Sequence, residues 1–148
     1  MRTYSKLFLT LSTIFLFSCK DDTIKLLEDM AGTWKVDEIV YSKTGQTAPD
    51  SVVKYPNSIF QLNECDDYKA KVCNGFYNLQ GNEKVNIQYN ASSSFNEASI
   101  FVYETTRPKI DLNGSYTVTI NDNNMTLKRS QASNVTYQGN SIELRLKK

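Results

Sequence analysis

The sequence predicts an all-β fold, a closed antiparallel barrel of eight strands that follows one short helix. From residue 32 onward, apolar and polar residues alternate over short segments, as they do when one face of each strand packs in a core and the other meets water. The connections between these segments are short and rich in Gly, Asn and Ser, which favour turns. No later stretch has the helical periodicity that crossovers between parallel strands require, so a parallel α/β sheet is excluded.

A short helix is predicted over residues 24–30, directly before the first strand. Asp22 or Thr23 can cap its N-terminus, because a short side chain with an oxygen atom accepts a hydrogen bond from a free backbone amide there. Gly32 is placed just after the helix end, where glycine turns the chain into the strand. The predicted apolar face consists of Ile24, Leu27 and Ala31.

The eight strands are predicted from period-two alternation between turn signals. In the fourth strand, Val85, Ile87 and Tyr89 point to one side, and the residues between them are polar. The longest loop is predicted at residues 42–51, and the Asn-rich segment 121–124 predicts a tight hairpin turn. The predicted strands are residues 32–41, 58–63, 72–79, 84–89, 100–104, 115–120, 125–128 and 141–146.

The first strand holds the only tryptophan of the chain and requires a local irregularity. Trp34 and Val36 share a face, and strict alternation would place Glu38 on that face as a buried carboxylate. A β-bulge near Glu38 would instead bring Ile39 and Tyr41 inward after Val36. We expect the bulge. In the alternative, Glu38 faces the barrel interior and is a candidate for contact with a ligand.

The first 18 residues have the pattern of an export signal. Arg2 and Lys6 precede an apolar run of 11 residues, 7–17, which is too short to cross a hydrocarbon core of about 30 Å as a helix. The run ends in Leu-Phe-Ser-Cys at residues 16–19, which resembles the lipobox of bacterial lipoproteins. The resemblance implies that Cys19 is acylated, for example with palmitate, and becomes the first residue of the mature chain. A structural cysteine behind an ordinary signal peptide is the alternative.

This resemblance divides the chain into a signal peptide (1–18), a lipidated tether (19–22) and a barrel domain (23–148). Lys-Asp-Asp at residues 20–22 resembles the acidic sorting tags of lipoproteins on the outer face of the outer membrane. The tag predicts a lipid-anchored protein of the outer membrane that is exposed at the cell surface. A solvated tether without sorting information is the other interpretation of the same three residues.

The charge balance argues against a nucleic-acid partner. The chain has 17 Lys and Arg residues against 16 Asp and Glu residues, and removal of Arg2 and Lys6 leaves 15 basic residues. No basic stripe is present, so nucleic-acid binding is not expected. Nor does a polybasic segment hold the domain against an anionic membrane. The predicted membrane contact therefore depends on the lipid at Cys19.

With Cys19 assigned to lipid, Cys65 and Cys73 remain as an even pair in an exported chain. Their separation of eight residues suits a disulfide across one hairpin connection, which would contribute about 2–3 kcal/mol. The alternative is a metal site built from these two cysteines with Asp66 and Asp67. The chain has no histidine and the spacing is not typical of zinc, so the disulfide is expected and no metal is.

These features together resemble the lipocalin-like family over residues 23–148: a short helix, Gly32 and Trp34 opening the first strand, eight strands and one hairpin disulfide. The resemblance implies an up-and-down barrel that is closed where the helix and the tryptophan lie. It also implies that a late basic side chain packs on the tryptophan ring, for which Arg145 and Arg129 are candidates.

Two functions of different class fit this sequence. The first is a lipoprotein that binds a small hydrophobic or amphipathic ligand inside its barrel. The second is a lipid-tethered interaction module with a filled barrel, an inhibitor or accessory subunit that uses its loops or outer wall. The volume of the barrel interior discriminates between them. Without histidine, a nucleophile elbow or a phosphate loop, neither an enzyme nor a cofactor is expected. The candidate ligand-lining residues are Glu38, Phe60, Tyr77, Tyr89, Tyr103 and Tyr116.

Overall fold

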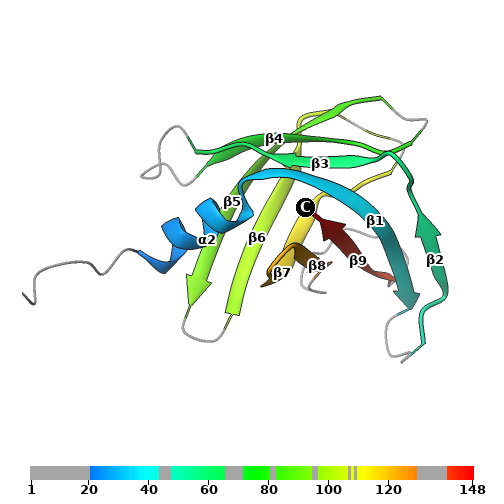
Figure 1. Ribbon diagram of the computed structural model, residues 1–148. Coiled ribbons are helices and arrows are strands. Elements are labelled where there is room, and N and C mark those ends of the chain that lie inside the picture. Colours follow the sequence, from blue (N-terminus) through cyan, green and yellow to red (C-terminus); the bar gives the residue numbers. More distant parts are fainter. Residues whose placement is uncertain are drawn as a thin grey trace, which may run out of the picture.

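The computed structural model describes residues 21–43, 48–65, 72–80, 83–94, 97–106, 108, 110–129 and 140–148. The predicted signal peptide and Cys19 lie outside these residues. Within them the chain forms one helix and nine strands (Figure 1). No helix in this described part is long and apolar enough to cross a membrane. The elements are α2 (Asp22–Met30), β1 (Gly32–Lys43), β2 (Ser51–Lys54), β3 (Ile59–Leu62), β4 (Cys73–Asn78), β5 (Val85–Ser94), β6 (Glu97–Glu104), β7 (Gly114–Asn121), β8 (Asn124–Arg129) and β9 (Asn140–Lys147).

Eight strands close into an antiparallel barrel, which confirms the predicted fold class. Strands β3 to β9 pair in chain order, and β1 completes the ring because it pairs with both β3 and β9. β1 is long and curved in Figure 1, and its second half extends past β3 to pair with β2. The sequence does not predict β2, since this strand has only four residues and follows a segment of loop composition.

The inward faces of the strands form one apolar core. In β5, Val85, Ile87 and Tyr89 are buried and the residues between them are exposed, which confirms the predicted parity. β5 continues to Ser94 and β6 begins at Glu97, so both strands are longer than the sequence predicts. The alternation is therefore a sound guide to which side chains face inward, and a weaker guide to where a strand ends.

Helix α2 lies at one end of the barrel and begins earlier than predicted. Its N-cap is Asp21, whose Oδ1 accepts a hydrogen bond from the Thr23 amide at 2.9 Å, so Asp22 and Thr23 are helical instead. Thr23 Oγ1 lies 3.4 Å from the Ser93 amide and connects the helix to the end of β5. Gly32 follows the helix with a φ of 123°, a conformation that side chains strongly disfavour. The buried face is Thr23, Leu26, Leu27 and Met30, rather than the predicted Ile24, Leu27 and Ala31.

Trp34 closes the same end of the barrel and is fully buried. Its indole Nε1 donates a hydrogen bond to the Met30 carbonyl oxygen at 2.7 Å, which joins the last turn of α2 to β1. The cation on its ring is Lys148, whose Nζ lies 4.5 Å from the ring centroid. The prediction of Arg145 for this role is wrong. Arg145 alternates with the buried Leu144 and Leu146, so it points away from the core.

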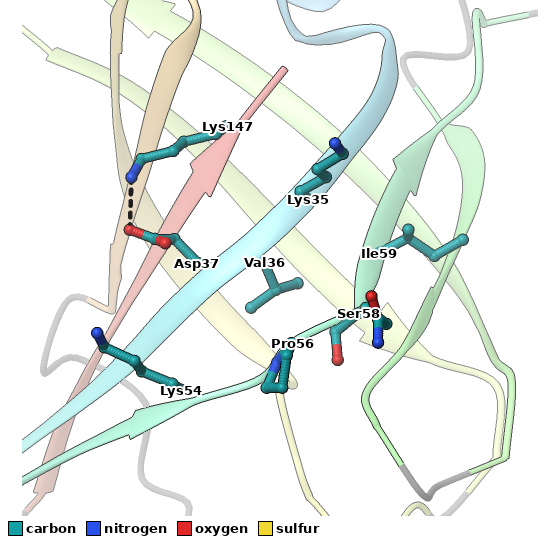
Figure 2. A pocket seen from close by; sticks show the side chains of 9 residues that line it. Lys35, Val36, Asp37, Lys54, Pro56, Ser58, Ile59 and Lys147 are labelled. Carbon is teal, nitrogen blue, oxygen red and sulfur yellow. Dashed lines mark ion pairs between the residues drawn. The ribbon is translucent and has the colours of Figure 1, made fainter.

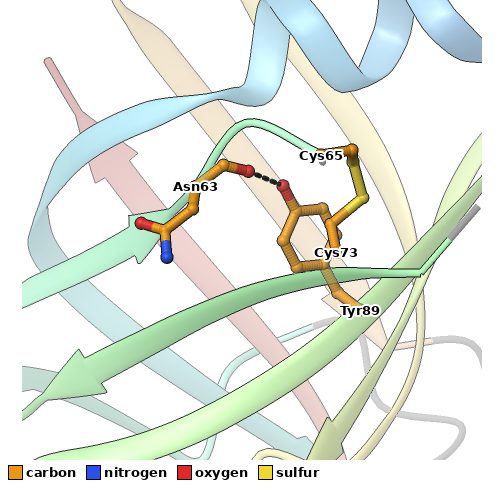
Figure 3. The surroundings of a disulfide bond; sticks show 4 residues. All are labelled: Asn63, Cys65, Cys73 and Tyr89. Atoms are coloured by element: carbon orange, nitrogen blue, oxygen red, sulfur yellow. Dashed lines mark hydrogen bonds between the residues drawn. A yellow bond between two sulfur atoms is a disulfide. The ribbon is translucent and has the colours of Figure 1, made fainter. Parts of the chain in front are cut away.

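The predicted disulfide is confirmed. Cys65 and Cys73 are bonded and buried, with their Cα atoms 4.8 Å apart, so their thiolates are not available as metal ligands. Figure 3 shows that the bridge lies beside Tyr89 of β5. The Tyr89 hydroxyl donates to the Asn63 carbonyl oxygen at 2.6 Å and ties the connection between β3 and β4 to the barrel. The helix, the tryptophan and the disulfide together close this end, which we call the helix end.

Candidate functional site

Four of the predicted ligand-lining residues are part of the packed core. Phe60, Tyr77, Tyr89 and Tyr116 each expose 2% of their surface or less. The rings of Phe60 and Tyr77 are parallel, with centroids 6.1 Å apart. A side chain that is this inaccessible has no space for a water molecule beside it. These four residues therefore fill the barrel instead of lining an open cavity.

The hydroxyl groups of these tyrosines also have partners within the protein. The Tyr116 hydroxyl donates to the Leu112 carbonyl oxygen at 2.7 Å. The Tyr77 hydroxyl lies 2.6 Å from Glu104 Oε1 and 2.8 Å from the Ile110 carbonyl oxygen. Together with the bond from Tyr89 to Asn63, these contacts satisfy the buried hydroxyls without a ligand.

Tyr103 does not face the barrel interior, and its prediction as a ligand-lining residue is wrong. It is 57% exposed on the outer face of β6. Its neighbours Val102 and Glu104 are buried, so strand parity directs Tyr103 outward. Aromatic character alone made this residue a candidate, whereas its position in the alternation indicates the opposite face.

Glu38 also lies outside the barrel. β1 bulges between Val36 and Glu38 relative to β9, which confirms the expected bulge, and Ile39 becomes the next buried residue. The Glu38 carboxylate pairs with Arg145 on the outer wall, with Oε1 2.5 Å from Nη1. Arg145 also pairs with Glu143 at 2.8 Å. The interpretation of Glu38 as an inward ligand contact is therefore wrong, because the bulge moves it to the solvent side.

The buried carboxylate belongs to Glu104, which is not among the residues predicted from the sequence. It is 4% exposed at the end of β6, away from the helix end. Its Oε1 accepts a hydrogen bond from the Leu112 amide and its Oε2 accepts one from Asn113 Nδ2 at 2.9 Å. These bonds hold residues 110–113 across this end of the barrel, which we call the Glu104 end. The alternation Ile100, Val102, Glu104 was the available signal, since it places Glu104 on the inner face.

Burial raises the pKa of Glu104 to about 7, although hydrogen bonds from Tyr77 and the Leu112 amide favour the ionised form. The geometry agrees with a protonated state. The Tyr77 hydroxyl has one proton but contacts two acceptors, Glu104 Oε1 and the Ile110 carbonyl oxygen. A proton on Glu104 would supply the second hydrogen bond. Glu104 therefore titrates near neutral pH as part of the structure at this end.

Arg129 completes the Glu104 end. Its guanidinium lies 5.5 Å from the centre of the Tyr116 ring, and its Nη2 donates to the carbonyl oxygens of Asp111 and Asn113. Gly114 has a φ of 143°, and a Cβ atom there would lie 3.1 Å from Arg129 Nε. Glycine thus permits both the backbone conformation and the approach of the arginine. Arg129, a candidate for contact with Trp34, instead packs on Tyr116.

On the outer wall, a tight turn separates β2 from β3 at the level of the β1 bulge. The Ser58 amide donates to the Tyr55 carbonyl oxygen at 3.2 Å, and Asn57 has a φ of 61°. Pro56 and Asn57 occupy the two central positions, as expected for a type II turn. The chain returns to β1 at Ser58, whose carbonyl oxygen accepts a hydrogen bond from the Val36 amide at 2.9 Å.

A cavity of about 620 Å³ lies between the bulge and this turn, and we call it the outer-wall cavity. It is lined by residues 35–37 of β1, Lys54, residues 56–59 and Lys147. Pro56 and Ile59 contribute apolar surface, and the charged side chains come from β1, β2 and β9 (Figure 2). Because the register of β1 changes at this level, the wall is less regular here than along the other strands.

The outer-wall cavity has three ammonium groups against one carboxylate. Lys147 Nζ lies 2.8 Å from Asp37 Oδ2, and this hydrogen bond holds the pKa of Asp37 below its ordinary value. Lys35 lies directly opposite Lys147 in the pairing of β1 with β9, where like charges repel. Among the described residues, neither Lys35 nor Lys54 forms an ion pair. The cavity therefore has an excess of positive charge that an anionic group would neutralise.

This cavity is not evident from the sequence, because its residues come from segments that are distant in the chain. The dipeptide Pro56–Asn57 was a usable turn signal. The position of Lys147 beside Lys35 depends on the closure of the barrel by β1 and β9, which alternation does not specify. A cluster of this kind becomes visible only when the register is known.

Comparison of the chain with protein-family models, curated proteins and solved structures finds no match. Within the described residues, no group of three or more cysteine, aspartate or glutamate side chains is placed to hold a metal ion. The side chains that line the outer-wall cavity are mainly ammonium groups and apolar groups.

Proposed function

We propose that this protein is a lipid-anchored binding protein of the outer membrane that holds its ligand on the outer wall. In this proposal the barrel is a rigid scaffold and not a container, and the protein is not an enzyme. The observation that carries it is the outer-wall cavity, with its three lysines, one aspartate and volume of about 620 Å³. Ligand pockets are typically about 300–1,000 Å³ in volume and combine apolar lining with a few polar groups.

The lining indicates the chemistry of the ligand. Lys35 and Lys54 can pair with a carboxylate, phosphate or sulfate, and Pro56 and Ile59 can contact an apolar part beside it. Because Lys147 is already paired with Asp37, the charge of a bound anion would be neutralised mainly by Lys35 and Lys54. We therefore expect an anionic ligand with an apolar portion.

The first function predicted from the sequence, binding of a small hydrophobic or amphipathic ligand inside the barrel, has less support. It requires space beside the inward aromatic side chains. Phe60, Tyr77, Tyr89 and Tyr116 are packed against their neighbours, and the tyrosine hydroxyls have internal partners. Rearrangement of this core would be needed before a ligand could enter, and that would cost packing energy.

The anchor follows from the resemblance of residues 16–19 to a lipobox and belongs to the same proposal. Acyl chains contribute about 0.8 kcal/mol of membrane-binding free energy per buried CH₂. They are the one strong source of membrane affinity that the sequence predicts. Cys19→Ser should therefore move the protein from the detergent phase to the aqueous phase in phase partitioning, or leave it uncleaved. A Cys19→Ser protein that is cleaved and still partitions into detergent would contradict the anchor.

The cavity can be tested with anilinonaphthalene sulfonate, a fluorescent anion with apolar rings. We expect saturable binding to the full-length protein in detergent, above the signal of detergent alone. Lys35→Ala and Ile59→Ala should each weaken this binding about tenfold, since one removes a charge and the other an apolar contact. Lys128→Ala removes an exposed lysine of β8 outside the cavity and serves as the matched control.

Nile red, a neutral apolar dye, separates the charge effect from general hydrophobic binding. We expect the Lys35→Ala variant to bind the sulfonate about tenfold more weakly and to bind Nile red as the parent protein does. Equal sulfonate binding by the parent, Lys35→Ala and Ile59→Ala proteins would exclude the cavity as the binding site.

A further inference from the structure

We propose that the free edge of β2 receives an extended acidic segment of a partner protein, whose carboxylates enter the outer-wall cavity. This inference rests on the proposed function, because the segment would be the source of the anionic group. It assigns the ligand to one class, a polypeptide that adds a strand to the wall of the barrel.

The first observation is that β2 is an edge strand. Within the described chain it pairs with β1 only, so its other side has no neighbouring strand. All four of its residues are exposed, including Val52 at 47% and Val53 at 37%. The free side of such a strand presents backbone amide and carbonyl groups that a further strand can pair with. Two exposed valines, one on each face, offer apolar contact to the side chains of that strand.

The second observation is that the edge ends at the cavity. Lys54 is the last residue of β2 and also lines the outer-wall cavity. A strand added to β2 would lie about 4.8 Å from it. One end of the added strand would therefore lie beside Lys54, the last residue of β2. An acidic side chain at that end would meet Lys54, with Lys35 on the neighbouring strand β1. Neither ammonium group forms an ion pair among the described residues.

Charge complementarity selects an acidic partner segment over a second copy of this chain. The strand Ser51–Lys54 contains one lysine and no carboxylate. Two β2 strands paired with each other would contribute lysines and no carboxylate, so neither copy could neutralise the ammonium groups of the other. A lysine and a proline near an edge are common protection against self-association, and Lys54 and Pro56 are placed in that way here. An acidic segment instead supplies carboxylates that can pair with Lys54 and Lys35.

The test uses a dye-labelled peptide that alternates glutamate with valine over eight residues, with both ends blocked. Its binding to the full-length protein in detergent is followed by fluorescence anisotropy. We expect binding that weakens as salt is added. Lys54→Glu and Lys35→Glu should each weaken it by about tenfold or more, and Lys128→Glu on β8 should leave it unchanged. A peptide with lysine in place of glutamate should not bind.

Two controls separate strand addition from simple charge attraction. The same peptide with N-methyl groups on alternate amides keeps its side chains but loses the backbone donors that a new strand needs, and it should bind about tenfold more weakly. Hydrogen exchange of the protein followed by mass spectrometry should show slower exchange in residues 51–54 when the unmodified peptide is bound, and no change there with the methylated one.

The outcomes distinguish this inference from the proposed function. If the unmodified and the N-methylated glutamate peptides bind equally, and hydrogen exchange in residues 51–54 does not change, strand addition is wrong. Binding of an anion in the outer-wall cavity would then still stand. The same holds if anilinonaphthalene sulfonate binds and the acidic peptide does not. If the protein dimerises with increasing concentration and Lys54→Glu changes this dimerisation, the partner of the β2 edge is a second copy of the chain. If the protein binds phosphatidylglycerol vesicles and this binding requires Lys54, the partner is a membrane surface. If neither the sulfonate nor the acidic peptide binds, or if both bind and no lysine variant weakens either, both proposals are wrong.

Discussion

The two ends of the barrel are closed by different kinds of interaction. At the helix end, α2 covers Trp34, and the Cys65–Cys73 bridge ties the neighbouring connection, so closure depends on apolar burial and a covalent bond. At the Glu104 end, residues 110–113 are held by hydrogen bonds to one buried carboxyl group. The first kind of closure is insensitive to pH, whereas the second depends on a group that titrates near pH 7.

The largest expected effect is at the helix end. Trp34→Ala should reduce the free energy of unfolding by about 3–5 kcal/mol, because it removes a fully buried side chain and leaves a cavity beneath α2. Denaturant unfolding followed by circular dichroism measures this change. Tyr103→Ala removes an exposed aromatic residue and should change stability by less than about 0.5 kcal/mol. Similar losses in the two variants would show that the helix end is not a packed core.

At the Glu104 end the expected effect depends on pH. The pKa of Glu104 is about 7 in the folded chain and 4.5 when it is unperturbed, so the folded state holds a proton that the unfolded state releases between these values. Stability should therefore fall as pH rises from about 4.5 to about 7. A pKa difference of this size corresponds to about 3 kcal/mol. Glu104→Gln, which does not titrate, should remove this part of the pH dependence.

The measurement compares the free energy of unfolding of the parent and Glu104→Gln proteins across pH 4–8 (about one unit per step). As the pH rises, the free energy of unfolding of the parent should fall relative to that of the Glu104→Gln variant. Glu83→Gln, at an exposed position before β5, is the matched control and should leave the difference constant. A constant difference for Glu104→Gln as well would mean that folding does not raise the pKa of Glu104.

This contrast also explains which parts of the structure the sequence could predict. The helix end depends on residues that are close in the chain, such as the two cysteines of one connection and Trp34 beside Gly32. The Glu104 end depends on long-range contacts: Tyr77 and Glu104 are 27 residues apart. Parity placed Glu104 inward, but no local pattern indicates that a tyrosine of β4 will meet it. The same limit applies to Lys148, which reaches Trp34 only because β9 returns to β1.

The outer wall falls between these two cases. The bulge before Glu38 was predictable, because strict alternation would have buried its carboxylate. The strand β2 was not, since four exposed residues have no hydrophobic face to reveal them. Its pairing follows from the length of β1, which continues beyond β3. Sequence patterns therefore predict elements that pack against a core better than elements that form an exposed edge.

The third prediction concerns the disulfide at the helix end. Replacement of both Cys65 and Cys73 by serine should lower stability by about 2–3 kcal/mol without loss of the barrel, because the bridge closes a short loop of the unfolded chain. The parent protein under reducing conditions should show the same loss, and the double variant should not respond to reductant. Complete unfolding of the double variant in native buffer would mean that the bridge, more than apolar burial, maintains this end.

The smallest expected effect is that of Lys148, and it tests whether charge contributes to the apolar end at all. The Lys148 ammonium lies over the Trp34 ring but is exposed, so its attraction to the ring should be worth about 0.5–1 kcal/mol. Lys148→Met keeps most of the side-chain length and removes the charge, and Lys25→Met on the exposed face of α2 is the control. If the ring is the partner of the cation, Lys148→Met should have almost no effect in a Trp34→Ala background. An equal loss in both backgrounds would assign the stabilisation to the contact of Lys148 Nζ with the Asp29 carbonyl oxygen, 3.4 Å away. The interaction of the Lys148 cation with the Trp34 ring would then make no contribution to the stability of the helix end.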